Sequence, residues 1–163
     1  MMNEIKDSTI LLMERMDDIV WSINPRNDSL ENLLMRVRHF ATTLFEARGI
    51  DYDISIQKNI DAVRLPMDFR QHVYLILKEA INNLVKYAGA RRATIRVGFD
   101  DRVMELAVID DGCGFEADSP ADGNGVPGMH KRAELMEADL LIRSAPGAGT
   151  EVRLKVMLEQ QIR

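Results

Sequence analysis

The first helix predicted by the sequence covers residues 4–24 and carries a narrow apolar stripe. The stripe follows a seven-residue repeat and consists of Ile5, Leu12, Met16, Ile19 and Ile23. Such a repeat is typical of a helix that packs against another helix, often in a dimer. Because the repeat is short, an amphipathic helix that folds onto its own domain is the alternative. Pro25 ends the helix, since it drives Asn24 out of the α conformation.

Residues 30–48 keep the apolar period of an α-helix and predict a second helix. Asp28 or Ser29 can cap its start, and Gly49 follows its last turn, where glycine is favoured. The alternation of apolar and polar residues from Ile50 to Ile56 then predicts a strand.

The rest of the chain mixes hairpins with helices. The predicted elements are a helix from Pro66 to about Tyr87, a hairpin of strands 93–99 and 104–108 joined at Asp100 and Asp101, a glycine-rich loop over 112–125, a helix from about Pro127 to Glu137, and strands over 140–144 and 150–158. This order favours an α+β fold, a two-layer α/β sandwich with helices on one face of a mixed sheet, preceded by an N-terminal helix.

Composition narrows the class of protein. The chain has 163 residues, an apolar fraction of 46% and a net charge of −5, with its basic residues dispersed, so we expect no nucleic-acid partner. No apolar run approaches the roughly 20 residues that a membrane-spanning helix needs, and no signal peptide is expected. The single cysteine, Cys113, excludes an internal disulfide and fits a reducing compartment. We therefore expect a soluble cytoplasmic piece.

The third predicted helix carries a polar stripe opposite its wide apolar face. Glu79, Asn83, Lys86 and Tyr87 are spaced so that they share one side of the helix. Glu79 could accept a proton, Asn83 offers the hard oxygen that Mg²⁺ prefers, Lys86 could pair with a phosphate, and Tyr87 could stack on a base. An ordinary solvated face is the alternative for this helix taken alone.

Two glycine loops follow. Asp110-x-Gly112-x-Gly114 comes directly after a predicted buried strand, where a carboxylate can accept a hydrogen bond from the exocyclic amine of adenine and glycine lets backbone approach the ring. Asp111 is interpreted as a turn residue.

Gly123-Asn124-Gly125 precedes a helix, whose free N–H groups and dipole favour a phosphate. The loop from Phe115 to Pro127 could act as a lid. Gly149-Thr150 opens the last strand, and the Thr150 hydroxyl could reach the same base.

In this order, the four segments resemble the nucleotide-binding boxes of the GHKL (Bergerat) ATPase superfamily. The runs Lys78–Tyr87 and Gly125–Ala133 are similar to those of histidine kinases, and Asp18–Pro25 resembles the end of their second dimerisation helix. The resemblance covers about residues 10–158. Tyr87 stands where relatives often have His, and Gly128 where an Asn is common.

The resemblance implies a role for each motif residue. It implies a catalytic or water-positioning acid at Glu79, a Mg²⁺ ligand at Asn83, nucleotide contacts from Lys86, Tyr87, Val126 and Thr150, adenine recognition by Asp110, a base pocket shaped by Gly112 and Gly114, and phosphate contacts at Gly123 and Gly125. The implied cofactors are ATP and magnesium.

The implied protein is the C-terminal part of a sensor histidine kinase, the cytoplasmic portion of an inner-membrane protein. Residues 1–25 would be the end of the dimerisation region and residues 26–163 the ATP-binding catalytic domain. The implied partners are the dimerisation helices of the same kinase in a homodimer and the receiver domain of a response regulator. An anti-sigma-factor type of serine kinase and a non-catalytic nucleotide-binding or interaction module are the alternatives.

None of the three histidines fits a phosphoacceptor motif. His39 is followed by Phe40, whereas the acceptor of such kinases is followed by Asp or Glu, and His72 and His130 lie in the predicted ATPase helices. The acceptor helix is therefore expected to lie upstream of Met1. The sequence predicts a chain that binds Mg-ATP and does not phosphorylate itself.

Overall fold

The computed structural model describes residues 2–57, 63–100, 102–116 and 123–158. The helices and strands are α1 (Met2–Ile23), α2 (Leu30–Arg48), β1 (Asp51–Ile56), α3 (Met67–Asn83), β2 (Arg92–Asp100), β3 (Val103–Asp110), α4 (Gly125–Leu135), β4 (Asp139–Ser144) and β5 (Thr150–Met157), with a 3-10 turn η1 (Pro25–Asn27) and a π-helical turn η2 (Leu84–Ala88). This is the predicted order. The predicted turn residue Asp101 and residues 117–122 of the predicted lid lie outside the described residues.

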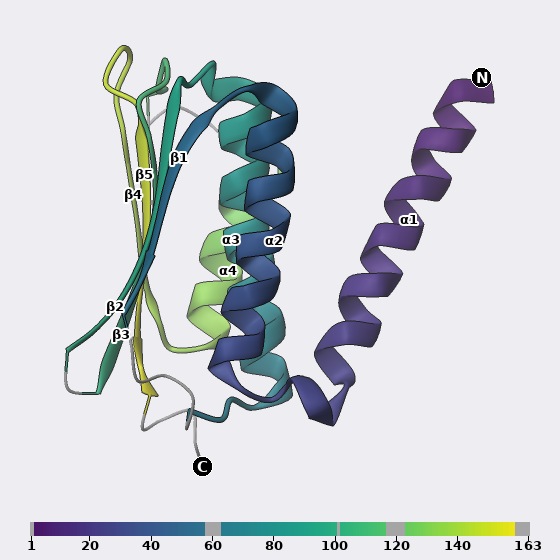
Figure 1. Ribbon diagram of the computed structural model, residues 1–163, viewed down its shortest axis with the longest axis vertical. Helices are drawn as coiled ribbons and strands as arrows, with labels where there is room; N and C mark the ends of the chain where they lie inside the picture. Colours follow the sequence, from purple (N-terminus) through teal and green to yellow (C-terminus); the bar gives the residue numbers. More distant parts are fainter. Residues whose placement is uncertain (1, 58–62, 101, 117–122, 159–163) are drawn as a thin grey trace.

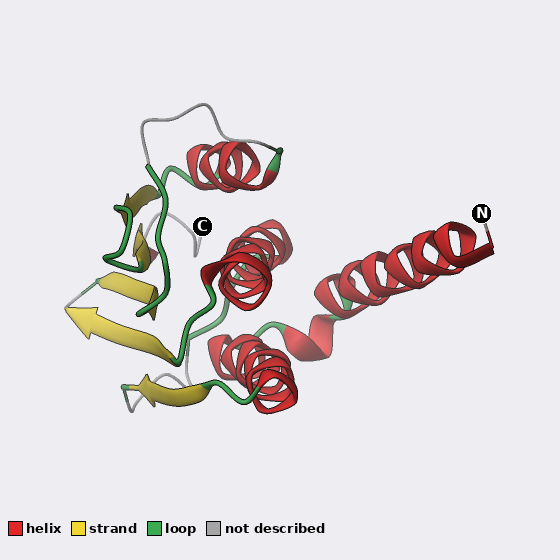
Figure 2. Cartoon of the chain, turned by 90° about the horizontal axis from the view of Figure 1, so that it is seen from above, coloured by secondary structure: helices red, strands yellow, loops and turns green. Residues whose placement is uncertain are grey.

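The described strands form one mixed sheet in the order β1-β2-β3-β5-β4. β1 runs parallel to β2, with α3 in the connection, and the other neighbours are antiparallel. Figures 1 and 2 show α2, α3 and α4 together on one face of the sheet. The predicted two-layer α/β sandwich with a mixed sheet is therefore confirmed.

The core fills the space between the helix layer and the sheet. α2 and α3 bury apolar residues at helical spacing, and the central strands bury every second residue, as the two periodicities require. The largest fully buried side chains include Leu33 and Phe45 of α2, Phe69, Ile76 and Ile81 of α3, Met104 and Leu106 of β3, Met129 of α4 and Leu154 of β5. In this packing α3 contacts β3 and α4, and α4 contacts β4.

Both ends of α2 form as the sequence predicts. The Ser29 hydroxyl accepts a hydrogen bond from the Asn32 N–H at 3.1 Å, so serine rather than Asp28 is the N-cap. Gly49 ends the helix with a φ of 64°, a left-handed conformation that glycine adopts without steric cost.

Two helix boundaries differ from the prediction. The α-helical part of α3 ends at Asn83, and the remaining residues to Ala88 form the π-helical turn η2. α4 begins at Gly125, before Pro127, because a proline in the first turn of a helix removes only an N–H that has no helical partner.

The apolar stripe of α1 faces away from the domain. Its members are exposed: Ile5 (63%), Leu12 (60%), Met16 (63%), Ile19 (48%) and Ile23 (52%). The helix projects from the sandwich in Figures 1 and 2 and contacts it near its C-terminal end. The stripe is therefore not the surface through which α1 packs on its own domain, and dimerisation through it stays a prediction.

Among the described helices, none has the length and apolar character that crossing a membrane requires.

We predict that Phe45→Ala lowers the free energy of unfolding by about 3–5 kcal/mol, because Phe45 is fully buried and the substitution leaves a cavity. Met35→Ala on the same helix is the control. Met35 is 61% exposed, so its truncation should change stability by less than about 0.5 kcal/mol. Urea denaturation followed by circular dichroism measures both, and equal losses would contradict the assigned core.

Candidate functional site

A cavity of about 560 Å³ lies between the helices α3 and α4 and the strands β3, β4 and β5. Nine of the residues proposed from the sequence line it: Glu79, Asn83, Tyr87, Asp110, Gly114, Gly123, Gly125, Val126 and Thr150. Lys86 and Gly112 are outside this lining. All four motif segments thus meet at one place, although they are far apart in the sequence.

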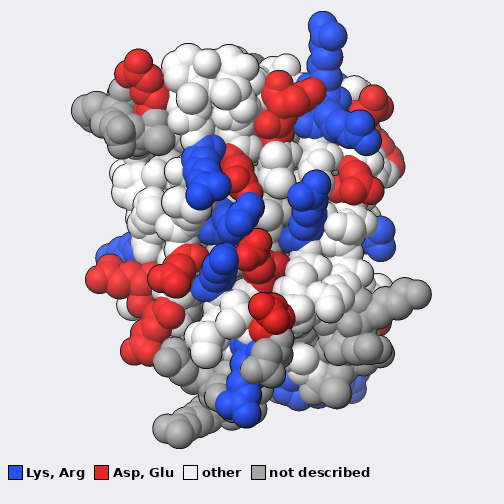
Figure 3. All heavy atoms as spheres, turned by 90° about the vertical axis from the view of Figure 1, so that its left-hand side faces the viewer, with Lys and Arg blue, Asp and Glu red and all other residues white. Residues whose placement is uncertain are grey.

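A larger hollow of about 730 Å³ is lined by residues of the other face of the sheet. Figure 3 shows this face, on which basic and acidic side chains lie close together. The lining of the hollow mixes basic residues such as Arg96 and Lys155 with acidic residues such as Glu105 and Asp139, and it includes none of the motif residues. Convergence of specific polar groups is a better guide to a site than size. The smaller cavity is therefore the candidate functional site.

The polar stripe of α3 borders the cavity at three of its four predicted positions. Glu79, Asn83 and Tyr87 are lining residues, and Tyr87 is 73% exposed at the rim. Lys86 is exposed but lies outside the lining. Lys86 lies in the π-helical turn, where α-helical spacing no longer applies. A phosphate contact from Lys86 stays a prediction.

Asp110 lies at the end of β3, buried beside the cavity. Its Oδ1 accepts a hydrogen bond from the Gly112 N–H at 2.8 Å, and β-sheet register places it opposite Thr150. Burial raises the pKa of the Asp110 carboxyl, and hydrogen bonds from the backbone of Gly112 and Thr150 oppose this shift. Burial removes water that would otherwise donate hydrogen bonds to the Asp110 carboxylate. A hydrogen-bond donor on a ligand could take the place of that water.

Asp111, the next residue, has a structural role. Its Oδ1 accepts hydrogen bonds from the N–H groups of Arg91 and Arg92, both at 2.8 Å. These bonds lower the pKa of the exposed carboxyl, with the Arg92 bond contributing most. Asp111 therefore joins the end of β3 to the start of β2, as expected of a turn residue, and it is absent from the cavity lining.

Gly112 and Gly114 in the first loop lie so close to neighbouring backbone that there is no room for a Cβ atom at either position. A Cβ at Gly112 would lie 2.3 Å from the carbonyl oxygen of Ala88, and one at Gly114 would lie 2.0 Å from that of Ala145. The close approach at both glycines is to neighbouring backbone, whereas the sequence interpretation attributed it to a bound base. These contacts hold the loop that frames the cavity.

The second glycine loop brings the start of α4 against α3. A Cβ at Gly125 would lie 2.3 Å from Oε1 of Glu79, so the carboxylate rests beside the first residue of α4. The N-terminus of an α-helix carries partial positive charge and free N–H groups, which favour anions. Gly123, Gly125 and Val126 place the start of α4 at one side of the cavity.

Ser144 at the end of β4 was not found from the sequence. Its Oγ accepts a hydrogen bond from the Phe115 N–H at 2.8 Å, donates to the Gly149 carbonyl at 3.1 Å and lies 2.9 Å from Oγ1 of Thr150. Ser144 thus joins the start of the predicted lid to β5. A lone serine at a strand end has no distinguishing sequence pattern. Ser144 itself is outside the cavity lining, and lining residues to which the sequence assigned no role include Glu116, Ile142 and Val152.

The three histidines lie outside the lining of the cavity. His39 and His130 are exposed. The Nδ1 atom of His72 is buried without a hydrogen-bond partner among the described residues, and burial, followed by the charge of Arg132, lowers the pKa of its imidazole. His72 therefore favours its neutral form at the interface of α3 with the rest of the domain.

The donor set fits magnesium that arrives with a phosphorylated ligand. Asn83 and Glu79 place two oxygen-bearing side chains on one side of the cavity. Within the described residues, no three His, Cys, Asp or Glu side chains gather as a metal cluster. Mg²⁺ is commonly held by one or two protein oxygens together with phosphate oxygens and water, which matches this sparse set.

A two-layer sandwich whose cavity joins a carboxylate at a strand end to the start of a helix suits a nucleotide-binding domain. Residues 69–160 match the family model described as "Histidine kinase-, DNA gyrase B-, and HSP90-like ATPase". The chain belongs to this family, and membership implies ATP binding. This confirms the resemblance found in the sequence.

Sensor kinases are among its relatives. The chain is 29% identical over 104 residues to sensor histidine kinase LiaS of Bacillus subtilis (strain 168), an alignment that covers 63% of this chain and 29% of LiaS. It is 27% identical over 109 residues to sensor protein VraS of Staphylococcus saprophyticus, covering 66% of this chain and 31% of VraS. The chain thus matches less than a third of the length of these relatives. Within that span, the chain is similar to a part of these two sensor kinases.

Solved structures share the fold. The histidine kinase domain from Erythrobacter litoralis EL346 blue-light activated histidine kinase superposes with a TM-score of 0.68 at 18% identity, covering 79% of this chain and 62% of that one. Histidine kinase AdeS of Acinetobacter baumannii gives a TM-score of 0.68 at 13% identity, covering 96% and 83%. At these identities the likeness concerns the fold.

The contact of Gly149 with Asp110 gives a test of the site's backbone geometry. Gly149 has a φ of 71°, and a Cβ there would lie 2.1 Å from the Asp110 carbonyl oxygen. We predict that Gly149→Ala destabilises the protein by about 1–2 kcal/mol from the left-handed backbone and by about 1–3 kcal/mol more from overlap. Gly147→Ala is the matched control, because its φ is 79° but no atom lies within 4 Å of the added Cβ. Equal losses in urea denaturation would contradict the close approach.

Proposed function

We propose that this domain binds Mg-ATP in the cavity of α3, α4 and β3 and transfers the γ-phosphoryl group to a histidine outside the chain. The observation that carries the proposal is the convergence of Asp110, Asn83, Glu79 and the start of α4 on one cavity. One ligand, a nucleotide with its metal ion, has three different requirements. They are a buried acceptor for the base, oxygens for the metal and an anion-binding helix start for the phosphates. Kinship with sensor histidine kinases supports the choice of acceptor.

The adenine half of the proposed site is centred on Asp110. The Asp110 carboxylate is proposed to accept a hydrogen bond from the exocyclic amine of adenine, in addition to the one that its Oδ1 accepts from the Gly112 N–H. Thr150, opposite Asp110 in the sheet, adds a hydroxyl on the same side. Tyr87, at the rim, is proposed to pack beside the base or sugar.

The phosphate half is proposed to lie over the start of α4. The backbone of Gly123, Gly125 and Val126 would donate to phosphate oxygens, helped by the helix dipole. Magnesium, when bound with ATP, neutralises charge that develops on the phosphates during transfer. Asn83 is the residue proposed to hold it through its amide oxygen.

Glu79 is proposed to act at the transfer step itself. Its carboxylate lies beside Gly125, next to the proposed phosphate position. During transfer, a nitrogen of the acceptor imidazole forms a bond to the γ-phosphorus, and the bond from this phosphorus to the leaving oxygen of ADP breaks. A carboxylate at this position would orient the imidazole and accept its other N–H, so that the attacking nitrogen is unprotonated.

The proposed activity also suggests the domain boundaries, the partners and the location of the protein. Residues 1–25 are proposed as the end of a dimerisation region and residues 26–163 as the catalytic domain, with the exposed stripe of α1 packing on dimerisation helices of the same kinase. The receiver domain of a response regulator is the proposed next phosphate acceptor. A cytoplasmic position at the inner membrane is part of the same proposal.

Asp110→Asn should weaken binding of a non-hydrolysable ATP analogue by about 10- to 100-fold, because it replaces a charge-assisted hydrogen bond worth roughly 1.5–3 kcal/mol. Isothermal titration calorimetry in the presence of Mg²⁺ measures this. Since the pKa of Asp110 is raised by burial, acidification should weaken binding at a higher pH than for an ordinary aspartate, as the carboxylate takes up its proton.

Asp111→Asn is the control for this substitution. It removes the same charge from the neighbouring residue, which bonds to backbone outside the cavity. The analogue should bind this variant with nearly the parent affinity. The proposal fails if the parent shows no heat of binding, or if Asp110→Asn binds as tightly as the parent.

Incubation of the isolated chain with γ-³²P-labelled ATP should give no acid-labile label. The three histidines lie outside the cavity lining, so none is placed to receive the γ-phosphate. Electrophoresis under alkaline conditions, with and without an acid wash, checks this. Label that acid removes would contradict the assignment of the acceptor to a segment outside this chain.

A further inference from the structure

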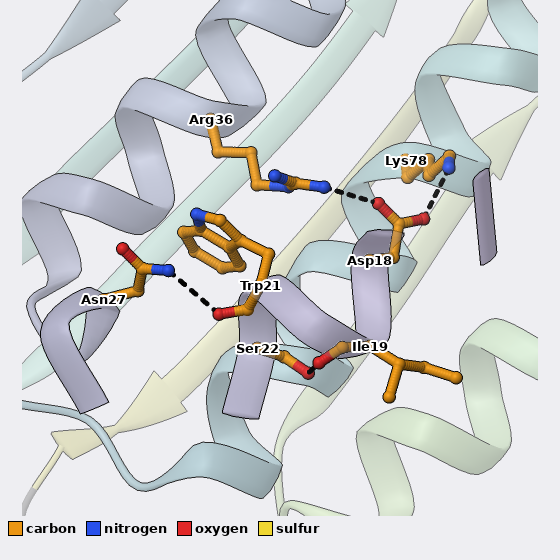
Figure 4. Close-up of polar contacts among 7 residues, drawn as sticks. All are labelled: Asp18, Ile19, Trp21, Ser22, Asn27, Arg36 and Lys78. Atoms are coloured by element: carbon orange, nitrogen blue, oxygen red, sulfur yellow. Dashed lines mark hydrogen bonds and ion pairs between the residues drawn. The ribbon is translucent and has the colours of Figure 1, made fainter. Parts of the chain in front are cut away.

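The C-terminal turns of α1 rest on α2 and α3 through one buried acid. Asp18 is 7% exposed, although it lies on a helix whose other described residues are mostly exposed. Its Oδ1 accepts a hydrogen bond from Nη2 of Arg36 at 2.9 Å, and its Oδ2 accepts one from Nζ of Lys78 at 2.6 Å (Figure 4). One carboxylate of α1 thus pairs with one cation from each of two other helices.

Aromatic rings enclose this ionic centre. The guanidinium carbon of Arg36 lies 4.8 Å from the ring centroid of Trp21 and 5.0 Å from that of Tyr74, and the two rings are 6.0 Å apart. Nζ of Lys78 lies 5.4 Å from the ring centroid of Phe40. Burial, with a smaller contribution from Asp18, raises the pKa of Tyr74 to about 12, so its hydroxyl stays neutral. Cation–π contacts of this kind strengthen where water is excluded.

A second set of contacts holds the end of α1. Arg70, only 3% exposed, donates from Nη2 to the carbonyl of Ser22 at 2.6 Å and from Nη1 to that of Leu65 at 2.8 Å. Nδ2 of Asn27 donates to the carbonyl of Trp21 at 3.0 Å, as Figure 4 shows. Donors from the domain therefore satisfy carbonyl groups that the last turn of a helix leaves free.

We call the receiving surface on the domain the α1 cradle; it consists of Arg36 and Phe40 of α2 and Arg70, Tyr74 and Lys78 of α3. It contacts Asp18, Trp21 and Ser22, which share one side of α1 at positions i, i+3 and i+4. The apolar stripe of α1 lies on other sides of the helix and is exposed. Docking thus sets both the angle of α1 and its rotation about its own axis.

The cradle and the cavity share one rigid element. Arg70, Tyr74 and Lys78 are spaced by four residues along α3, and Glu79 directly follows Lys78 toward the cavity. Residues four apart lie on one side of a helix, and the next residue is turned by about 100°. α3 therefore presents the cradle on one side and the proposed catalytic acid on another.

We propose that Asp18 is a positioning residue, whose buried contacts with Arg36 and Lys78 hold α1 in a defined orientation relative to the ATP cavity. The consequence for transfer rests on the proposed function: a phosphoacceptor helix packed on the stripe of α1 would meet the γ-phosphate at a place that the cradle determines. The docking itself requires neither ATP nor catalysis.

Distances between two spin labels test the docking in the full chain. On a Cys113→Ser background, nitroxides attached at Ser8→Cys on α1 and Leu141→Cys on β4, both exposed positions, report the orientation of α1 by double electron–electron resonance. Dilution with unlabelled chain removes distances between copies. We expect a single narrow distribution in the parent and its loss in Asp18→Asn, because Arg36 and Lys78 lose their shared anion.

Two further variants make the test specific. Asp17→Asn removes the same charge from the exposed neighbour of Asp18 and should keep the narrow distribution. Asp18→Lys combined with Lys78→Asp restores opposite charges and should recover part of the narrow peak, which a general loss of stability would not explain. A narrow, unshifted peak in Asp18→Asn would overturn the proposal. If that variant does not fold, Lys78→Met takes its place with the same criterion.

The nucleotide affinity separates this inference from the proposed function. Asp18 does not line the cavity, so Asp18→Asn should bind the ATP analogue within about two-fold of the parent, as expected for independent sites. A large loss of affinity would show that Asp18 acts on the site itself and overturn a purely positioning role. If neither protein binds the analogue, the proposed function fails while the distance measurements still decide the docking.

Discussion

The site depends on how firmly α3 is packed on the sheet. Asn83 and Glu79 belong to the helix layer, whereas Asp110 and Thr150 belong to the strands, so the width of the cavity is the spacing of the two layers. Close-packed apolar side chains maintain that spacing, because an interior at crystal-like density resists both expansion and compression. The same helix binds α1 on a different side. α3 therefore contributes to the core, to the proposed nucleotide site and to the contact with α1.

The strand ends show a second constraint, which concerns backbone rather than side chains. At Gly112, Gly114 and Gly149 a single added carbon would overlap a carbonyl oxygen of a neighbouring segment. These approaches pack backbone against backbone in the segments that flank Asp110, whose carboxylate is buried beside the cavity. The pKa of this group is raised as a result. A buried carboxylate lowers the stability of the protein without ligand. A ligand that donates a hydrogen bond to the carboxylate offsets this cost, as is often the case for groups at functional sites.

The sequence predicted the order of elements, the layer arrangement and the motif residues that meet at the cavity, because apolar periodicity and glycine spacing are local signals. It did not predict the π-helical turn that contains Lys86, because the apolar period of the helix continues through those residues. Ser144 was missed because its hydrogen bonds join segments that are distant in sequence. The docking of α1 through Asp18 was missed for the same reason: the apolar stripe was the stronger local pattern, and it proved to face solvent.

The strand order has a consequence for how copies of the domain can coexist. Among the described strands, β1 and β4 form the two edges, and each has six residues. Asp51 and Asp53 on one edge, and Asp139 and Arg143 on the other, place charges where an incoming strand would pair. Short, charged edges disfavour sheet extension between molecules. Neighbouring copies can therefore be held at high local concentration without fusing into a continuous sheet.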